Sequence, residues 1–343
     1  MLTRRRFLTI LPGAWLASQT IPRRLAAGPL ETGDETAIPP AIGASQRVAD
    51  PARQPPVELV PASSLYCKIL QFTDLHLQQK TEELDAATFS DCRQQLARHR
   101  PDLVVVTGDA WHSNLEGAGR RGLELFIKNA SGWGVPWAFC WGNHDQLDDY
   151  QRGHDLLESA PHSLYRGGQA HGHYRIEIRT ARPGGSLAAR GDLFLLNSGA
   201  TGLGAFSLGW LRSATSRLQA TRPGPLPAFA FFHLPLPDYE SRIAGANFRG
   251  LKLSHVDPLQ THPQAYATLA ASQTIRAGYC GHCHVNDYTL KTNGPELVMS
   301  RATGRASFGE EYAAKGAKLI EIELATGQFQ HRTVFPNGSE WLV

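Results

Sequence analysis

The feature that most restricts the fold of this chain is a regular alternation of apolar runs and helical stretches from residue 65 onward. Three runs predict strands: YCKILQF (66–72), DLVVVTG (102–108) and PWAFCWG (136–142). Continuous apolar runs of this length suit a sheet that is covered on both faces. Each run precedes a stretch that predicts a helix, near 82–98, 119–130 and 147–158. This order predicts an α/β fold, with helices packed on a sheet.

After residue 170 the sequence becomes richer in predicted strands. HYRIEIR and GDLFLLN flank a Gly-rich turn near 184, and a helix near 207–219 precedes the strand AFAFFH (228–233). The last quarter holds five more apolar runs: AGYCGH, DYTLKT, ELVMSRA, AKLIEIEL and QFQHRTVF. Strands at this spacing predict a second sheet, packed on the first.

Residues 1–27 differ in charge from the rest of the chain. They hold five Arg and no acidic residue, and their apolar run is shorter than the roughly 20 residues that span a bilayer. TRRRFL (Thr3–Leu8) resembles the twin-arginine export signal, in which paired arginines precede Phe-Leu. That resemblance implies a signal peptide over 1–27, recognition by the twin-arginine export machinery, and a periplasmic or secreted protein.

Residues 28–62 are rich in Pro, Ala and Gly and have no apolar periodicity, which predicts a loosely attached linker. The folded domain is therefore predicted over 63–343. Without the five leader arginines, 29 Lys and Arg stand against 31 Asp and Glu, so nucleic-acid binding has no electrostatic support. No other segment predicts a membrane span, so we expect no stable span once the leader is processed.

Polar side chains follow five of the predicted strands, at the point where each strand ends. They are Asp74 and His76 in QFTDLH, Asp109 in VTGDA, Asn143, His144 and Asp145 in CWGNHD, His233 in FFHLP, and His282 and His284 in CGHCH. Ligands of α/β sheets bind beyond the carboxyl ends of the strands. Oxygen and imidazole donors favour Zn, Mn or Fe, and a set of this size suits two ions that share a carboxylate.

The segment CGHCH (280–284) has two interpretations. Cys280, Cys283 and His284 match the C-x-x-C-H attachment site of c-type haem, whereas His282 and His284 offer imidazoles to a metal ion. We favour the metal site because an apolar strand precedes the motif and because four other strands supply the remaining ligands. The two cysteines could form a disulfide or stay as free thiols.

The motifs D-x-H, G-D, G-N-H-D, a single His and G-H-x-H, in this order, resemble the calcineurin-like metallophosphoesterase superfamily. The resemblance covers about residues 66–335. Within it, FFHLPLPDY, GHCHVNDY and RATGRASFGEEYAAKGAKLIEIE are similar to the branch related to purple acid phosphatases. It implies an α/β, four-layer metallophosphoesterase fold, with two stacked mixed β-sheets flanked by helices.

The resemblance also implies a role for each residue. The ligands of a first metal ion would be Asp74, His76 and His284. The ligands of a second ion would be Asn143, His233 and His282. Asp109 would bridge the two ions, and His144 would face the substrate, with Asp145 orienting its ring.

Two positions depart from the purple enzymes. His112 stands where they usually have Tyr, three residues after the bridging Asp, and His76 is a residue that they typically lack. We therefore expect a first site of the colourless type, with His112 beside the ligands rather than on the metal. Cys283, between His282 and His284, should point away from the metal ions because side chains alternate along extended backbone.

The implied reaction is hydrolysis of a phosphomonoester by a hydroxide that bridges two ions of Mn, Fe or Zn, divalent or of mixed valence. His144 would stabilise the phosphate and protonate the leaving group. Three alternatives remain: a phosphodiesterase acting on a cyclic nucleotide or a lipid head group, an inactive metal-bound binding protein, and a c-type haem protein. The complete ligand set argues against an inactive site.

Overall fold

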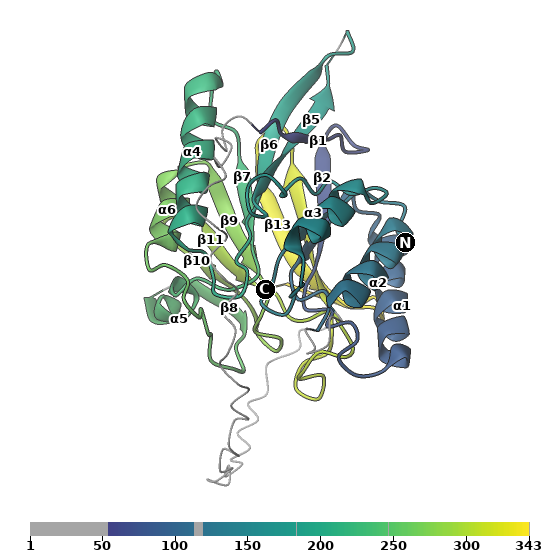
Figure 1. Ribbon diagram of the computed structural model, residues 1–343. Helices are drawn as coiled ribbons and strands as arrows, with labels where there is room; N and C mark the ends of the chain where they lie inside the picture. The colour runs from purple at the N-terminus through teal and green to yellow at the C-terminus, as the bar shows by residue number, and fades with distance from the viewer. Residues whose placement is uncertain (1–53, 113–118, 183, 246, 343) are drawn as a thin grey trace, which may run out of the picture. The chain divides into compact units, whose positions relative to one another are not determined.

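The structure is a computed structural model that describes residues 54–342, apart from 113–118, 183 and 246. The described residues form one compact unit (Figure 1). The predicted signal peptide, 1–27, and most of the predicted linker lie outside the described residues. Among the described residues, no helix is both long and apolar enough to cross a membrane.

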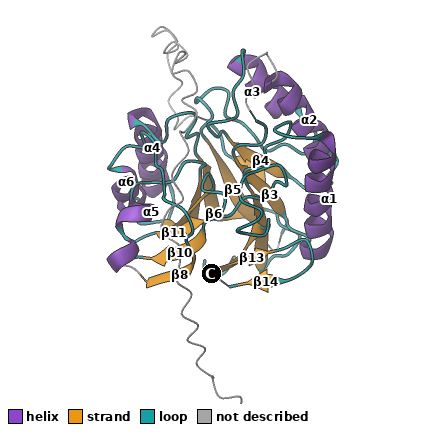
Figure 2. Ribbon diagram, turned by 90° about the horizontal axis from the view of Figure 1, so that it is seen from below, coloured by secondary structure: helices purple, strands orange, loops and turns teal. Residues whose placement is uncertain are grey.

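The described strands form two sheets, packed between two layers of helices (Figure 2). One sheet has six described strands in the order β14-β13-β12-β2-β3-β4. Their bounds are β2 (Tyr66–Phe72), β3 (Leu103–Thr107), β4 (Trp137–Cys140), β12 (Ala317–Glu323), β13 (Phe329–Val334) and β14 (Glu340–Trp341). Three helices flank this sheet: α1 (Glu82–His99), α2 (Gly119–Ser131) and α3 (Tyr150–Ser159).

The other sheet has eight described strands in the order β1-β5-β6-β7-β9-β11-β10-β8. Their bounds are β1 (Val57–Leu59), β5 (Tyr174–Ala181), β6 (Leu187–Leu195), β7 (Ala228–Phe231), β8 (Asn247–Leu251), β9 (Ile275–Cys280), β10 (Asp287–Lys291) and β11 (Glu296–Met299). Helices α4 (Ala205–Thr221), α5 (Asp238–Ser241) and α6 (Ala265–Ala271) flank it, and a short 3₁₀ turn, η2 (Ile243–Gly245), follows α5.

The predicted fold class is confirmed, and two details of the prediction are wrong. The second half of the chain does not form the second sheet alone, because β12 pairs antiparallel with β2 and returns the C-terminal strands to the first sheet. The folded domain also begins before residue 63. Val57–Leu59 of the predicted linker forms β1, which pairs in parallel with β5. Three residues are too few to show a periodicity, and this strand depends on its distant partner.

Apolar side chains from both sheets meet in one core. Phe231 of β7 and Tyr279 of β9 stack with ring centroids 5.1 Å apart, and they share a buried cluster with Ile69 of β2 and Ile320 of β12. All four are fully buried. This packing fixes the position of one sheet relative to the other. The carboxyl ends of strands from both sheets can therefore lie close together.

A buried ionic cluster also joins the sheets. Asp287 of β10 is fully buried and accepts hydrogen bonds from Lys318 of β12 and from the Thr333 hydroxyl of β13. The Arg301 guanidinium, just after β11, donates to the same carboxylate at 2.6 Å. The cluster therefore connects strands of the eight-stranded sheet with strands of the six-stranded sheet through buried charges.

We expect Asp287→Ala to lower the free energy of unfolding by about 3–5 kcal/mol, because two buried cations lose their counter-ion. Denaturant unfolding followed by circular dichroism measures this change. Glu124→Ala is the matched control, because it breaks an exposed ion pair with Arg120 that contributes about 0–1 kcal/mol. Equal unfolding midpoints for the two variants would contradict the role given to Asp287.

Candidate metal centre

The structure brings all eight predicted site residues to one place. They lie on the loops that directly follow β2, β3, β4, β7 and β9, at the carboxyl ends of these strands. The predicted strand-end arrangement is therefore confirmed. Three of the loops belong to the six-stranded sheet and two to the eight-stranded sheet, so both sheets build the site.

Asp74, His76, Asp109 and His284 form a first ligand group, in which one donor atom of each residue lies within 4.8 Å of the others. The Nε2 atom of His284 is 3.2 Å from Oδ1 of Asp74 and 3.1 Å from Nε2 of His76. The Nε2 atom of His76 is 3.6 Å from Oδ2 of Asp109. These donors surround a space suited to one ion.

Asp109, His233 and His282 form a second ligand group on the same criterion. The Nε2 atom of His233 is 3.0 Å from Oδ2 of Asp109 and 3.0 Å from Oδ1 of Asn143. Asp109 thus belongs to both ligand groups, as the prediction of a bridging carboxylate requires.

The hydrogen bonds of the two carboxylates leave one oxygen of each for a cation. Oδ2 of Asp74 accepts from the Thr73 hydroxyl at 2.7 Å and from the His282 backbone N–H at 3.0 Å. Oδ1 of Asp109 accepts from the His144 backbone N–H at 2.8 Å. The remaining oxygens, Oδ1 of Asp74 and Oδ2 of Asp109, are buried and have no hydrogen-bond partner among the described residues.

The tautomer of His233 points to the same conclusion. Its Nδ1 atom lies 2.8 Å from the carbonyl oxygen of Thr107, which can only accept, so Nδ1 carries a proton. In the neutral ring the lone pair of Nε2 then faces the oxygens of Asp109 and Asn143. Buried acceptors that face one another without a donor are unfavourable. The residues present therefore fit metal ions, which such acceptors would bind directly.

The protonation states of these side chains suit metal ligands. Burial by itself raises the pKa of Asp74, but the imidazoles of His284 and His233 outweigh it and hold that pKa below its ordinary value. Burial lowers the pKa of His76 to about 3 and that of His282 to about 4, so both rings are neutral at pH 7. Metal ligation requires these protonation states.

His233 is the exception to this pattern of neutral imidazoles. Burial lowers its pKa, but the carboxylates of Asp109 and Asp74 outweigh burial and raise the pKa to about 10. A proton on this ring therefore compensates the buried carboxylates when no other cation does. Metal binding would displace that proton, as is general for imidazole ligands.

Four of the predicted ligands have left-handed backbone conformations. The φ angles are 53° for Asp74, 47° for His76, 49° for Asp109 and 69° for His282. Non-glycine residues in this region store roughly 1–3 kcal/mol each and cluster at functional sites. These conformations turn the backbone sharply after each strand, so that the side chains that follow point into the site.

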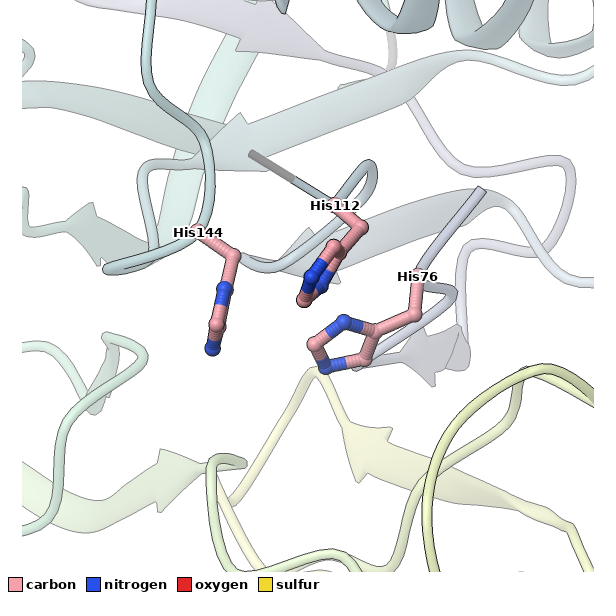
Figure 3. A group of neighbouring side chains, drawn as sticks. All are labelled: His76, His112 and His144. Atoms are coloured by element: carbon pink, nitrogen blue, oxygen red, sulfur yellow. The ribbon is translucent and has the colours of Figure 1, made fainter. Parts of the chain in front are cut away.

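His112 and His144 lie beside the first ligand group. Their rings stack with centroids 4.8 Å apart, and with His76 they form a further group of possible metal ligands (Figure 3). The sequence placed His112 near the ligands, and the structure agrees. Sequence reasoning missed Thr73 and the Thr107 carbonyl, which orient Asp74 and His233, because no motif marks a residue that acts through its neighbour.

Asp145 binds backbone on two loops of the site. Its two carboxylate oxygens accept backbone N–H groups, from Asp109 at 2.8 Å, Ala110 at 2.8 Å and Gly142 at 2.7 Å. We expected it to orient the ring of His144. The contacts with backbone give it a further task, because they fix the loop after β3 against the loop after β4 and thereby position Asp109. Sequence spacing alone does not distinguish a side-chain partner from a backbone partner.

The haem interpretation of CGHCH is wrong. All five cysteines are buried and free, so Cys280 and Cys283 form no disulfide. Both cysteines pack in another buried apolar cluster, which includes Leu208, Tyr239 and Met299, and Sγ of Cys280 lies 3.6 Å from the sulfur of Met299. Cys283 points away from the ligand groups, as expected, and His284 lies within the first of them. The thiols are thus not placed to hold a haem beside His284.

Comparisons with known proteins show the family to which the chain belongs. The family model described as calcineurin-like phosphoesterase matches residues 67–285, more than half of the 343 residues. The chain is 23% identical over 299 residues to "Probable inactive purple acid phosphatase 29" of Arabidopsis thaliana, an alignment that covers 75% of this chain and 77% of that protein. The family resemblance predicted from the motifs is therefore confirmed.

Two solved structures show the same fold. Purple acid phosphatase PPD1 from yellow lupin (Lupinus luteus) seeds superposes with a TM-score of 0.52 at 13% identity, covering 82% of this chain and 54% of that one. GAP50, the anchor in the inner membrane complex of Plasmodium, also gives 0.52, at 10% identity, covering 81% of this chain and 89% of that one. At these identities the likeness concerns the fold alone.

Gly142→Ala tests the packing around Asp109. A Cβ atom at Gly142 would lie 2.2 Å from Oδ1 of Asp109, so the carboxylate must shift from its present position in the two ligand groups. We expect this variant of the full chain to retain fewer metal ions after dialysis than the unaltered chain, as measured by elemental analysis. Gly204→Ala is the control, because its Cβ would meet no atom within 4 Å. Full metal content in Gly142→Ala would refute the bridging position of Asp109.

Proposed function

This chain belongs to the calcineurin-like phosphoesterase family, and on that premise we propose that it hydrolyses a phosphomonoester at a binuclear metal centre. The observation that carries the proposal is that two adjoining ligand groups share one residue, Asp109. A shared carboxylate is the arrangement that holds two ions at the short separation of two-metal hydrolases, about 3.5–4 Å. The proposed ions are Mn, Fe or Zn, since the donors are oxygen and imidazole.

The ions and the protein have separate tasks in the proposed reaction. When bound, two metal ions neutralise the phosphoryl oxygens and lower the pKa of water at the site. The protein holds the ions through the first and second ligand groups and Asn143. Asp74 and Asp109 supply the negative charge, and the neutral rings of His76 and His282 add none. The bridging carboxylate is in turn fixed by the loop contacts of Asp145.

His144 is the proposed proton donor. Its backbone N–H donates to Asp109 at 2.8 Å, which places the residue next to the ligand that both groups share. Its ring stacks on His112 and remains partly exposed, so a substrate can reach it. Transfer of a ring proton to the departing alkoxide oxygen is a general-acid role for which imidazole is well suited.

An inactive binding protein is the second candidate. One observation favours it: the Arabidopsis relative carries "inactive" in its name. The donor atoms of this chain argue for activity, because both ligand groups are complete and buried acceptors in them lack other partners. A phosphodiesterase would use the same residues, and the choice between ester classes is a matter for substrate assays.

We expect His144→Ala, loaded with Mn²⁺, to keep the metal content of the unaltered chain and to lose about 10²–10⁴-fold in kcat/KM. The loss should be larger for an alkyl phosphate than for p-nitrophenyl phosphate, because an alkoxide needs a proton to leave and nitrophenolate does not. Steady-state rates on both monoesters, with bis-p-nitrophenyl phosphate as the diester, measure this.

Three results would contradict parts of the proposal. Equal losses on the two monoesters would remove the acid role of His144. Faster turnover of the diester would make the protein a phosphodiesterase. Two bound ions with no turnover of any ester would favour the inactive binding protein.

We further propose export through the twin-arginine pathway to the periplasm or the exterior, where the substrate would lie. The support is the run Arg4–Arg6 followed by Phe7 and Leu8, which lies outside the described residues. Export would move the protein already folded, with its metal ions in place.

Changing both Arg5 and Arg6 to Lys should keep the protein in the cytoplasm, because an ammonium group does not reproduce the planar, five-donor contact of a guanidinium. Cell fractionation with immunoblotting measures the distribution. Changing Arg23 and Arg24 to Lys is the matched control and should leave export unaffected. Export of the Arg5 and Arg6 variant at the control level would reject this route.

A further inference from the structure

Three imidazoles, one of them from the first ligand group, lie close together without a carboxylate among them. One ring nitrogen each of His76, His112 and His144 lies within 4.8 Å of the other two. The ring centroids are 5.7 Å apart for His76 and His112, and 5.0 Å apart for His76 and His144. Figure 3 shows the three side chains converging on one another from three separate loops.

Backbone contacts fix these loops relative to one another. The N–H of His112 donates to the carbonyl of Leu77 at 2.9 Å, and the N–H of Leu77 donates to the carbonyl of Ala110 at 3.1 Å. The loop of His144 is held by its N–H to Asp109. The fold therefore holds the three rings in place before an ion binds, and this preorganisation favours metal binding.

Two of the rings carry buried nitrogens that nothing in the described residues satisfies. The Nδ1 atoms of His76 and His112 have no hydrogen-bond partner there, and His76 is 1% exposed. Buried polar atoms normally have a hydrogen-bond partner, so these two nitrogens are available to bind a metal ion.

We propose that His76, His112 and His144 form a nitrogen-rich seat for a metal ion, overlapping the first ligand group. Three imidazoles with an open fourth position are a ligand set that Zn²⁺ accepts, and Cu²⁺ binds such nitrogen donors more tightly still. Mn²⁺ prefers oxygen donors and stays with the carboxylates. His76 belongs to both sets, so the two positions compete for one ion.

The seat has a consequence for catalysis that rests on the proposed function. An ion bound there engages His144, and therefore competes with the proton-donor role of that ring. Metal selection and turnover are then coupled through one side chain. The seat itself is independent of any activity, because its ligands and their geometry are present whether or not an ester is hydrolysed.

Binding of Zn²⁺ and of Mn²⁺ to the metal-free full chain tests the seat, by competition with a chromophoric chelator. We expect His112→Ala to weaken the tightest Zn²⁺ binding by about tenfold or more, and to change Mn²⁺ binding by less than about twofold. His255→Ala is the control, because this imidazole is 78% exposed and belongs to none of the three groups. Unchanged Zn²⁺ binding in His112→Ala, or equal losses for both ions, would overturn the proposal.

Electron paramagnetic resonance of the unaltered chain with one equivalent of Cu²⁺ gives a second readout, which needs no variant to fold. The first and second ligand groups contain two imidazoles each, so coupling to three imidazole nitrogens identifies a set that includes His112. Coupling to two nitrogens would overturn the proposal. Neither measurement uses ester hydrolysis, so a protein without phosphatase activity still tests the seat.

Discussion

The convergence of buried acceptor atoms on Asp109 is the constraint on which the rest of the site depends. One oxygen of this carboxylate is held by a backbone N–H, while the other faces His233 and His76 without a hydrogen-bond partner among the described residues. Positive charge is favoured in such a space, and the carboxylates of Asp109 and Asp74 raise the pKa of His233 against the effect of burial. The same electrostatic need makes the position suitable for metal ions.

The fold supplies this constraint through features remote from the ligands. The shared core and the cluster around Asp287 hold the two sheets together, so that loops from both sheets reach one place. Asp145 then fixes the loop after β3 to the loop after β4 through backbone N–H groups. Left-handed backbone at four ligands completes the turn into the site. The positions of the side chains in the site therefore depend on packing and hydrogen bonds of residues that do not themselves belong to the ligand groups.

The fold alone does not determine what such a site does. The purple acid phosphatase from yellow lupin and the GAP50 anchor of Plasmodium superpose on this chain equally well. The difference must lie in the side chains at the strand ends, where this chain has two groups of possible metal ligands and two further imidazole contacts around His112. The balance between carboxylate and imidazole donors, which is local to those loops, would set the choice of metal.

The sequence by itself determined the strands and the residues that end them, because apolar runs and the polar groups after them are local patterns. It therefore located Asp74, Asp109 and His233, and the fold class. Only the tertiary structure decided that β12 returns to pair with β2, that three residues of the supposed linker form β1, and that Asp145 binds backbone. These depend on contacts between residues far apart in the chain, which no local pattern records. The tertiary structure also decided that the thiols of CGHCH are free, because both cysteines pack in a buried apolar cluster.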